Sequence, residues 1–188
     1  MSSRDTYHHG DLRRAVLTAA LDVIRTEGPG VLSLRDLARR AGVSHAAPAH
    51  HFKDRTGLLT AIATEGHDLL TAALSEATDL RDAGVRYVRF AVAHPAHFQV
   101  MFRPDLLRPD DPHLMAARAR SYGQLRAGVA ALPDDRTTDP DLVGIAAWST
   151  AHGFATLLLT HNLDRALGGR GPEDAFRALA GALFDSAA

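Results

Sequence analysis

Apolar residues recur along this chain at intervals of three and four positions, which is the spacing of one face of an α-helix. A first stripe of this kind ends at Gly28-Pro29-Gly30, so we expect a helix that stops there; its members are Leu12, Val16, Ala19, Ala20, Val23 and Ile24. No segment shows the alternating Val, Ile and Thr pattern that is typical of strands. The pattern predicts an all-α fold of about nine helices.

Residues 33–52 predict two short helices joined by a tight turn. Ser33 is a typical N-cap, and the apolar positions that follow it are Leu34, Leu37, Ala38 and Ala41. Gly42 is expected to end this helix because glycine adopts a positive φ without strain, and Ser44 is predicted to cap the second helix. The side chains of the second helix are small or polar, which suits a helix that lies against the bases of DNA. We therefore predict a three-helix helix-turn-helix domain over residues 1–53.

A longer helical region follows, and we expect it to form a C-terminal helical bundle over residues 54–188. Asp54 is predicted to cap a long helix that continues to Leu74. The region from Ala83 to Phe102 predicts two helices that meet near His94-Pro95. Three more helices are predicted to begin at a proline that follows a turn or cap residue, at Asp111-Pro112, Asp139-Pro140 and Gly171-Pro172.

Composition and charge narrow the class of protein. The 188 residues are 46% hydrophobic, enough for a sizeable core, and contain no cysteine, which is compatible with a reducing cytoplasm. The sequence has no signal-like segment and no uninterrupted apolar run of about 18 residues, so no membrane partner is expected. The net charge is −1, but residues 1–60 carry +3 and the other residues −4, which favours DNA binding by the N-terminal part.

Several motifs in the first 62 residues resemble those of the tetracycline-repressor-type (TetR) family of transcriptional regulators. They are YHHGDL at Tyr7–Leu12, the pair Glu27-Gly28 that closes the first helix, SLRDLARRAGVS at Ser33–Ser44, and HHF with the following Arg and paired Leu at His50–Leu59. A shorter motif, WSTAHG at Trp148–Gly153, is similar to the Trp-His-Gly signature of one subgroup of the family.

The resemblance implies an all-helical cytoplasmic homodimer that binds a pseudo-palindromic operator in double-stranded DNA and is released by a small-molecule inducer. Such a repressor acts by binding without turnover, so neither an enzyme activity nor a cofactor is expected. Gly10 and Asp11 would lie near one phosphate. The other predicted DNA-contact residues are Arg35 at the start of its helix, Ser44, His45, Ala46, Ala47, Ala49, His50, His51, Lys53, Arg55 and Thr56.

Two positions in the second helix depart from the family pattern. Ala49 stands where an aromatic residue usually contacts the DNA backbone, and Pro48 stands where many members have Leu. Because Pro48 has no N–H to bond to the preceding turn, the start of this helix is expected to be tight or partly 3₁₀.

Aromatic and apolar residues of the C-terminal region are candidates for a ligand cavity and a dimer interface. Trp148 and His152 share one helix face, and they either line a cavity or pack in the core. The other candidate lining residues are Phe98, Met101, Phe102, Met115 and Tyr122. A second set would form an isologous dimer interface, or close the core in a monomer: Gly153, Phe154, Leu157, Phe176, Ala180, Leu183 and Phe184.

Three alternatives to a repressor released by a small molecule can be tested against the residues present: an enzyme, a regulator that senses a protein, and a metal-binding protein. An enzyme that uses His152 as a base would need a nucleophile, and the chain has no Cys, no G-x-S-x-G and no paired carboxylates at a suitable spacing from His152. A DNA-binding regulator that senses a protein partner instead of a metabolite fits the same sequence. A metal site at His50/His51 or at His94/His97 lacks a third ligand at a recognisable spacing, so no metal is expected.

Overall fold

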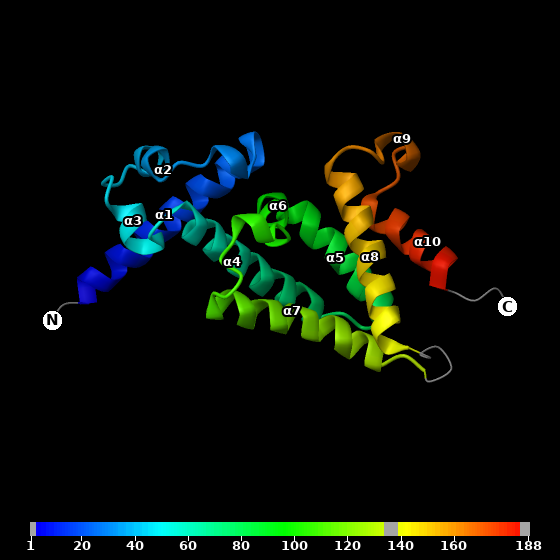
Figure 1. Ribbon diagram of the computed structural model, residues 1–188. Coiled ribbons are helices and arrows are strands. Elements are labelled where there is room, and N and C mark those ends of the chain that lie inside the picture. The colour runs from blue at the N-terminus through cyan, green and yellow to red at the C-terminus, as the bar shows by residue number, and fades with distance from the viewer. Residues whose placement is uncertain (1–2, 134–138, 185–188) are drawn as a thin grey trace. The chain divides into compact units, whose positions relative to one another are not determined.

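The computed structural model describes residues 3–133 and 139–184, with side chains from Leu12 onward. Over these residues it contains ten α-helices, two short 3₁₀ turns and no strand (Figure 1), which confirms the predicted all-α fold. The helices are α1 (Ser3–Glu27), α2 (Leu34–Arg40), α3 (Ala47–Phe52), α4 (Arg55–Ser75), α5 (Leu80–Ala93), α6 (Pro95–Met101), α7 (Pro112–Ala130), α8 (Pro140–Leu159), α9 (Asp164–Leu167) and α10 (Pro172–Phe184). The 3₁₀ turns are η1 (Pro29–Val31) and η2 (Pro104–Leu106).

Most helix ends lie where the capping residues predicted them. The side-chain oxygens of Asp54, Asp111 and Asp139 accept hydrogen bonds from backbone N–H groups in the first turns of α4, α7 and α8. All three predicted proline starts are confirmed, and so is the break between α5 and α6 at His94. The four-residue helix α9 was not predicted, because so short a segment has no apolar period to detect.

The chain folds into two compact units. Unit 1 consists of residues 1–66 and 95–116, and unit 2 consists of residues 67–94 and 117–188. Helices α4 and α7 each contribute residues to both units. The predicted division into a DNA-binding domain, residues 1–53, and a C-terminal bundle, residues 54–188, is a division by function and stays a prediction.

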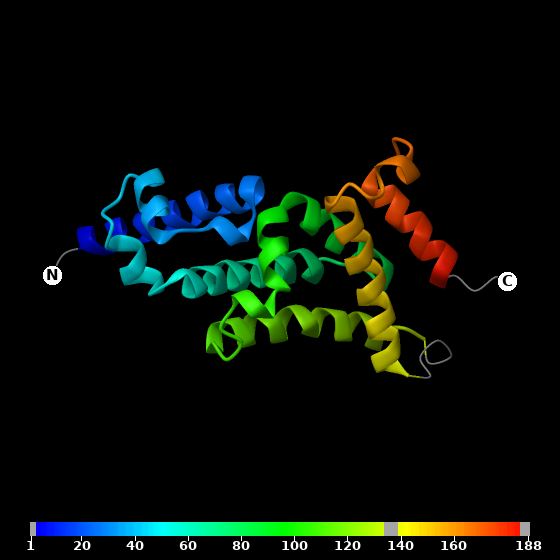
Figure 2. The same cartoon turned by 45° about the horizontal axis from the view of Figure 1, so that its top comes forward.

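Unit 1 packs α1 against the helix-turn-helix and against α6. Helix α1 contacts α2, α3 and α6, and α2 contacts α3. Figures 1 and 2 show α2 and α3 lying beside α1. Side chains from these helices and from the start of α4 are fully buried and form the core: Val16, Ile24, Leu37, Pro48, Leu58, Leu59, Ile62 and Met101. Because α2 and α3 each anchor apolar residues in this core, their other faces are held toward solvent.

Unit 2 is built around α5, α8 and α10, which contact one another. The aromatic rings of Phe154 on α8 and Phe176 on α10 stack edge to face with their centroids 5.4 Å apart. Val85 and Val88 on α5 are buried against this layer, as is Ala155 on α8. Apolar side chains from all three helices therefore make one core.

Helix α8 is the one helix in the described part of the chain that is long and apolar enough to cross a membrane, on length and composition alone. Its mean hydropathy is 1.5 over an 18-residue window, and 22% of that window is buried. Ala151 and Ala155 face the core, whereas Leu142, Ile145 and Leu157 are exposed. An apolar helix that its own protomer covers only in part is typical of a contact surface for another protein.

Candidate nucleic-acid interface

The helix-turn-helix forms as the capping pattern predicted in its first half. The Ser33 hydroxyl oxygen accepts a hydrogen bond from the N–H of Asp36 at 3.5 Å and caps α2. Gly42 ends the helix with a φ of 66°. The N–H of Val43 then donates to the carbonyl of Ala38 at 3.0 Å, which closes the turn. Leu37 and Ala38 are buried, so α2 is fixed in unit 1 by its apolar side.

The second half differs from the prediction at its first residues. Helix α3 begins at Ala47, Ala46 occupies the N-cap position, and no side chain caps it. The prediction that Ser44 caps this helix is therefore wrong. The Ser44 carbonyl instead accepts from the N–H of Ala47 at 3.1 Å, a bond between residues three apart, which confirms the expected tight start. Pro48 explains the difference, because a proline is best accommodated in the first turn of a helix.

One face of α3 is anchored and the other is exposed. Pro48 and Phe52 are buried in unit 1. The exposed residues are Ser44, His45, Ala46, Ala49, His50 and Lys53, and Ala47 and His51 are half-buried. Most of the predicted DNA-contact residues of the reading helix thus lie on a solvent-facing surface. A short helix with a buried anchor and a small, polar outer face can enter the major groove.

The arginines of α2 differ in their surroundings. Arg35 is exposed in the first turn, where it was predicted to meet a phosphate. Arg39 pairs with Asp36 at 3.6 Å and Arg40 pairs with Glu27 at 3.2 Å. Both pairs are largely exposed, and such pairs hold their partners only weakly. Arg35 remains the predicted DNA contact on α2 because it lies in the first turn, where the helix N-terminus also attracts a phosphate.

Arg55 lies in a different environment from the one expected of a phosphate contact. Its Nη2 donates a hydrogen bond of 2.6 Å to the carbonyl of Pro29, and its Nε is buried without a hydrogen-bond partner. The side chain is half-buried, as is the neighbouring Thr56. In this structure Arg55 braces the start of α4 against the turn that follows α1. The predicted contacts of Gly10 and Asp11 lie outside the residues whose side chains are described.

Sequence reasoning missed a role of α1 on this side of unit 1. The guanidinium carbon of Arg13 lies 5.6 Å from the centroid of the Phe52 ring, so a cation–π contact links α1 to the end of α3.

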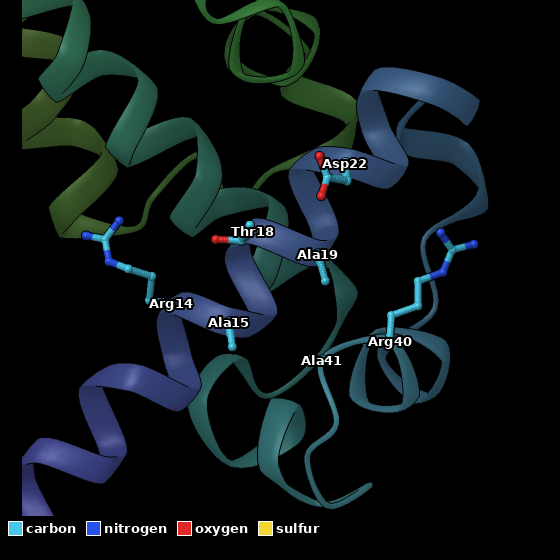
Figure 3. A pocket seen from close by; sticks show the side chains of 7 residues that line it. All are labelled: Arg14, Ala15, Thr18, Ala19, Asp22, Arg40 and Ala41. Carbon is cyan, nitrogen blue, oxygen red and sulfur yellow. The ribbon is translucent and has the colours of Figure 1, made fainter.

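Farther along, α1 and the end of α2 border an open depression of about 460 Å³. Figure 3 shows Arg14 and Arg40 on opposite sides of it, with small side chains between them. Its lining residues are Arg14, Ala15, Thr18, Ala19, Asp22, Arg40 and Ala41.

The predicted ligand-binding residues are divided between the two units. Phe98, Met101, Phe102 and Met115 belong to unit 1, and Tyr122, Trp148 and His152 belong to unit 2. In unit 1, Phe98 and Met101 are buried and the rings of Phe98 and Phe102 stack with centroids 5.4 Å apart, whereas Met115 is exposed. In unit 2, the rings of Trp148 and His152 lie 5.7 Å apart, and Tyr122 is exposed on α7.

Tyr87 on α5 completes a polar cluster with Trp148 and His152 that the sequence did not reveal. Its hydroxyl lies 2.8 Å from Nδ1 of His152. Burial raises the pKa of Tyr87 well above its usual value of 10, and a hydrogen bond with the Trp148 side chain opposes this rise. Burial lowers the pKa of His152 below its usual 6.5. The hydroxyl of Tyr87 and Nδ1 of His152 are within hydrogen-bond distance, and which of the two donates depends on the tautomer of His152.

The predicted dimer residues fall into two groups. Phe154, Phe176 and Ala180 are buried where α5, α8 and α10 meet within one protomer. Leu157, Leu183 and Phe184 are exposed, and Gly153 is half-buried with nothing within 4 Å of the point where a Cβ would lie. Two further exposed apolar residues of α8, Leu142 and Ile145, belong with the exposed group although the sequence did not single them out.

Comparison with known protein families agrees with this architecture. The family described as "Tetracyclin repressor-like, C-terminal domain" matches residues 80–183, which is more than half of the chain. The chain belongs to the TetR family. The family described as "Bacterial regulatory proteins, tetR family" matches residues 16–62, which contain the helix-turn-helix, so this TetR-family chain is a transcriptional regulator with a DNA-binding domain.

Similar proteins match either about a quarter of the chain or nearly all of it. The TetR-family chain is 45% identical over 49 residues to the HTH-type transcriptional regulator BetI of Klebsiella pneumoniae (strain 342), a match that spans 26% of this chain and 25% of BetI. It is 34% identical to a protein of unknown function from Rhodococcus sp. RHA1, over 95% of this chain and 96% of that one, with a TM-score of 0.77.

A third relative shows the fold with ligands bound. The structure of AibR in complex with isovaleryl coenzyme A and operator DNA is 17% identical, covers 92% of this chain and 98% of AibR, and has a TM-score of 0.69. At this identity the match to the TetR-family chain concerns the fold alone.

Proposed function

We propose that this TetR-family regulator is a cytoplasmic repressor that binds a pseudo-palindromic operator as a homodimer and is released from it by a small molecule. Residues 1–53 would bind DNA, and residues 54–188 would bind the ligand and the second protomer. The observation that carries the proposal is the surface of α3 and of the turn before it, where His45, Ala49 and His50 are exposed while Pro48 and Phe52 are buried. The protein acts by binding, without turnover.

Recognition of DNA is proposed to divide between two kinds of residue. His45, Ala46, Ala47, Ala49 and His50 lie at the start and along the outer face of α3 and would meet base edges. Arg35, Ser44, His51, Lys53 and Thr56 would meet phosphates and fix the position of the reading helix. Arg55 would act through its hydrogen bond to Pro29, by holding α4 against the helix-turn-helix.

The second protomer is proposed to cover the exposed apolar face of α8 and α10. Leu157, Leu183 and Phe184 contribute to this face, and Gly153 allows a close approach because a Cβ added there would meet nothing within 4 Å. A dimer of two-fold symmetry uses the same patch on both protomers and presents two reading helices to one duplex.

The ligand is proposed to bind near Trp148 and His152. The half-buried imidazole of His152 lies beside the indole of Trp148, which is 42% exposed. An apolar surface with one oriented polar group is typical of a small-molecule site. Tyr122, on the part of α7 that belongs to unit 2, remains a proposed lining residue, and Phe98, Met101, Phe102 and Met115 of unit 1 stay predictions from the sequence. The WSTAHG segment also supports placing the protein in the Trp-His-Gly subgroup. The AibR complex, which contains operator DNA and isovaleryl coenzyme A, supports a DNA partner and a small-molecule partner.

Selection of genomic DNA fragments on the purified protein tests the proposal. The protein should retain a small set of fragments that share an inverted repeat. Lys53→Gln should weaken binding to every duplex alike and reduce the slope of log affinity against log salt concentration by about one. His50→Ala should change the preferred bases at one position of each half-site with little change in that slope.

The conservative variant Lys53→Arg controls for the backbone at this position, where φ is 67°, and should keep the salt slope of the wild type. Failure of the wild-type protein to retain any duplex at low ionic strength would overturn the proposed function.

A further inference from the structure

The connection between the reading helix and α4 is only two residues long, Lys53 and Asp54. Lys53 has a φ of 67°, and its N–H donates to the carbonyl of Ala49 at 2.9 Å. The N–H of Asp54 donates to the carbonyl of Phe52 at 2.8 Å. The orientation of α3 relative to α4 is therefore set by the conformation of these two residues.

A residue far along the chain holds this connection from outside the helix-turn-helix. Arg108 follows η2 in the loop between α6 and α7, and its Nη2 lies 2.6 Å from Oδ2 of Asp54. The other oxygen of Asp54, Oδ1, accepts from the N–H of Gly57 at 2.8 Å and caps α4. Each oxygen of this carboxylate is thus assigned to a different partner, and the helix cap and the ion pair can be separated by mutation.

Two further contacts tie the same loop to the start of α4. The backbone N–H of Arg108 donates to Oγ1 of Thr60 at 3.0 Å, and that hydroxyl donates to the carbonyl of Thr56 at 2.7 Å. A Cβ on Gly57 would lie 3.0 Å from Nη1 of Arg108 and would overlap the carbonyl oxygen of Phe52, so this position leaves room for the guanidinium only because it is glycine. The guanidinium therefore lies beside the first turn of α4.

We propose that Arg108 is a positioning residue for operator recognition, which holds the Lys53-Asp54 connection so that α3 is presented in the orientation that fits DNA. The inference rests on the proposed function and adds a residue that neither the helix-turn-helix pattern nor the family motifs contain. The part of Arg108 is to limit the orientations of α3 before DNA is bound, because a preordered reading helix loses less conformational freedom on binding.

Three properties separate this role from a phosphate contact and from a general contribution to folding. A residue that does not touch DNA leaves the number of neutralised phosphates, and hence the salt slope, unchanged. A residue that acts through Asp54 loses its effect when Asp54 is changed. A residue that orders the Lys53-Asp54 connection protects the backbone amides of that connection against hydrogen exchange.

Operator affinity is measured with a duplex recovered by selection of genomic fragments on the wild-type protein. Arg108→Ala should lower affinity for that duplex about threefold with an unchanged salt slope, because an ion pair with side chains 34% and 58% exposed contributes modestly. Asp54→Asn keeps the helix cap but removes the charge, and it should cause a loss of similar size. The double variant should be no weaker than either single variant, and Arg108→Lys should recover part of the loss.

Arg103→Ala is the matched control, because Arg103 lies in the same loop and pairs with Asp105 at 2.8 Å on the surface. It should leave affinity unchanged. In the absence of DNA, the amides of residues 52–58 should exchange faster in Arg108→Ala than in the wild type or in Arg103→Ala, while the midpoint of thermal unfolding stays close to that of the wild type.

Wild-type affinity in Arg108→Ala, a salt slope reduced by about one, or additive losses in the double variant would each overturn the inference. A wild-type protein that retains no duplex would refute the proposed function instead. The exchange measurement then still decides whether Arg108 orders the Lys53-Asp54 connection. Unchanged exchange in Arg108→Ala would show that it does not.

Discussion

Gly84 on α5 lies beside the ring of Phe176 on α10. A Cβ at this position would be 2.6 Å from Cε1 and 3.0 Å from Cζ of Phe176. The Phe176 ring is 3% exposed and stacks against Phe154, so it has little room to retreat. Gly123 on α7 provides a contrast within unit 2, because it is also helical but exposed, with nothing within 4 Å of the corresponding point.

Gly84→Ala should lower the free energy of unfolding by about 1–3 kcal/mol, because the added methyl group overpacks the contact with Phe176. Gly123→Ala should raise it by about 0.5–1 kcal/mol, because alanine loses less backbone entropy in a helix and meets nothing there. Urea unfolding followed by circular dichroism measures both. Equal effects of the two substitutions would show that the α5–α10 contact is looser than described.

The pairing of α5 with α8 includes the polar cluster of Tyr87, Trp148 and His152 within an otherwise apolar contact. The Tyr87 hydroxyl and His152 Nδ1 are 2.8 Å apart, and burial lowers the pKa of His152. The folded protein therefore binds a proton at His152 less readily than the unfolded chain. By linkage, stability falls as the pH falls below about 6.5, the pKa of an unperturbed histidine, toward the lower pKa of the folded state.

Comparison of urea unfolding at about pH 7.5 and about pH 5.5 should show a loss of stability that is smaller in His152→Gln than in the wild type. The carboxylates whose pKa values are lowered by arginine partners, such as Asp82 and Glu173, titrate below this range and do not contribute to the difference. His113→Gln changes an exposed ring and serves as the control. The same pH dependence in all three proteins would contradict this account of the cluster.

At the scale of the whole molecule, the apolar surface that one protomer leaves open on α8 and α10 is the physical basis of the proposed dimer. Leu157 is 46% exposed, Leu183 58% and Phe184 44%. Burial of the exposed half of such side chains contributes about 0.7–1.5 kcal/mol each, so a face that is used twice by symmetry would stabilise a dimer appreciably.

Leu157→Asp should convert the protein to a monomer, because a two-fold interface would bury two new carboxylates without partners. Sedimentation equilibrium measures the change in mass, and the helical content should stay that of the wild type. Affinity for the operator should fall as well, because a monomer presents one reading helix. Val31→Asp places the same charge on an exposed apolar site in unit 1 and should leave the mass of the dimer unchanged; a dimeric Leu157→Asp protein would place the interface elsewhere.

Features that depend on near neighbours in the chain could be predicted without the structure. Helix periods, the caps at Ser33, Asp54, Asp111 and Asp139, and the three proline starts were all predictable, because each involves residues within about four positions of one another. The family was predictable for the same reason, since its motifs occupy continuous segments. Local reasoning failed at Ser44, where the preference of Pro48 for the first helical turn prevailed over a good capping residue.

Only the tertiary structure decided which side chains from distant segments share an environment. It turned Arg55 toward Pro29, joined Tyr87 to His152, divided the predicted dimer residues into buried and exposed groups, and brought Arg108 to Asp54 across 54 positions of sequence. Such contacts depend on how whole helices pack, and the packing is set by the summed burial of many apolar side chains. No short segment of sequence contains that sum.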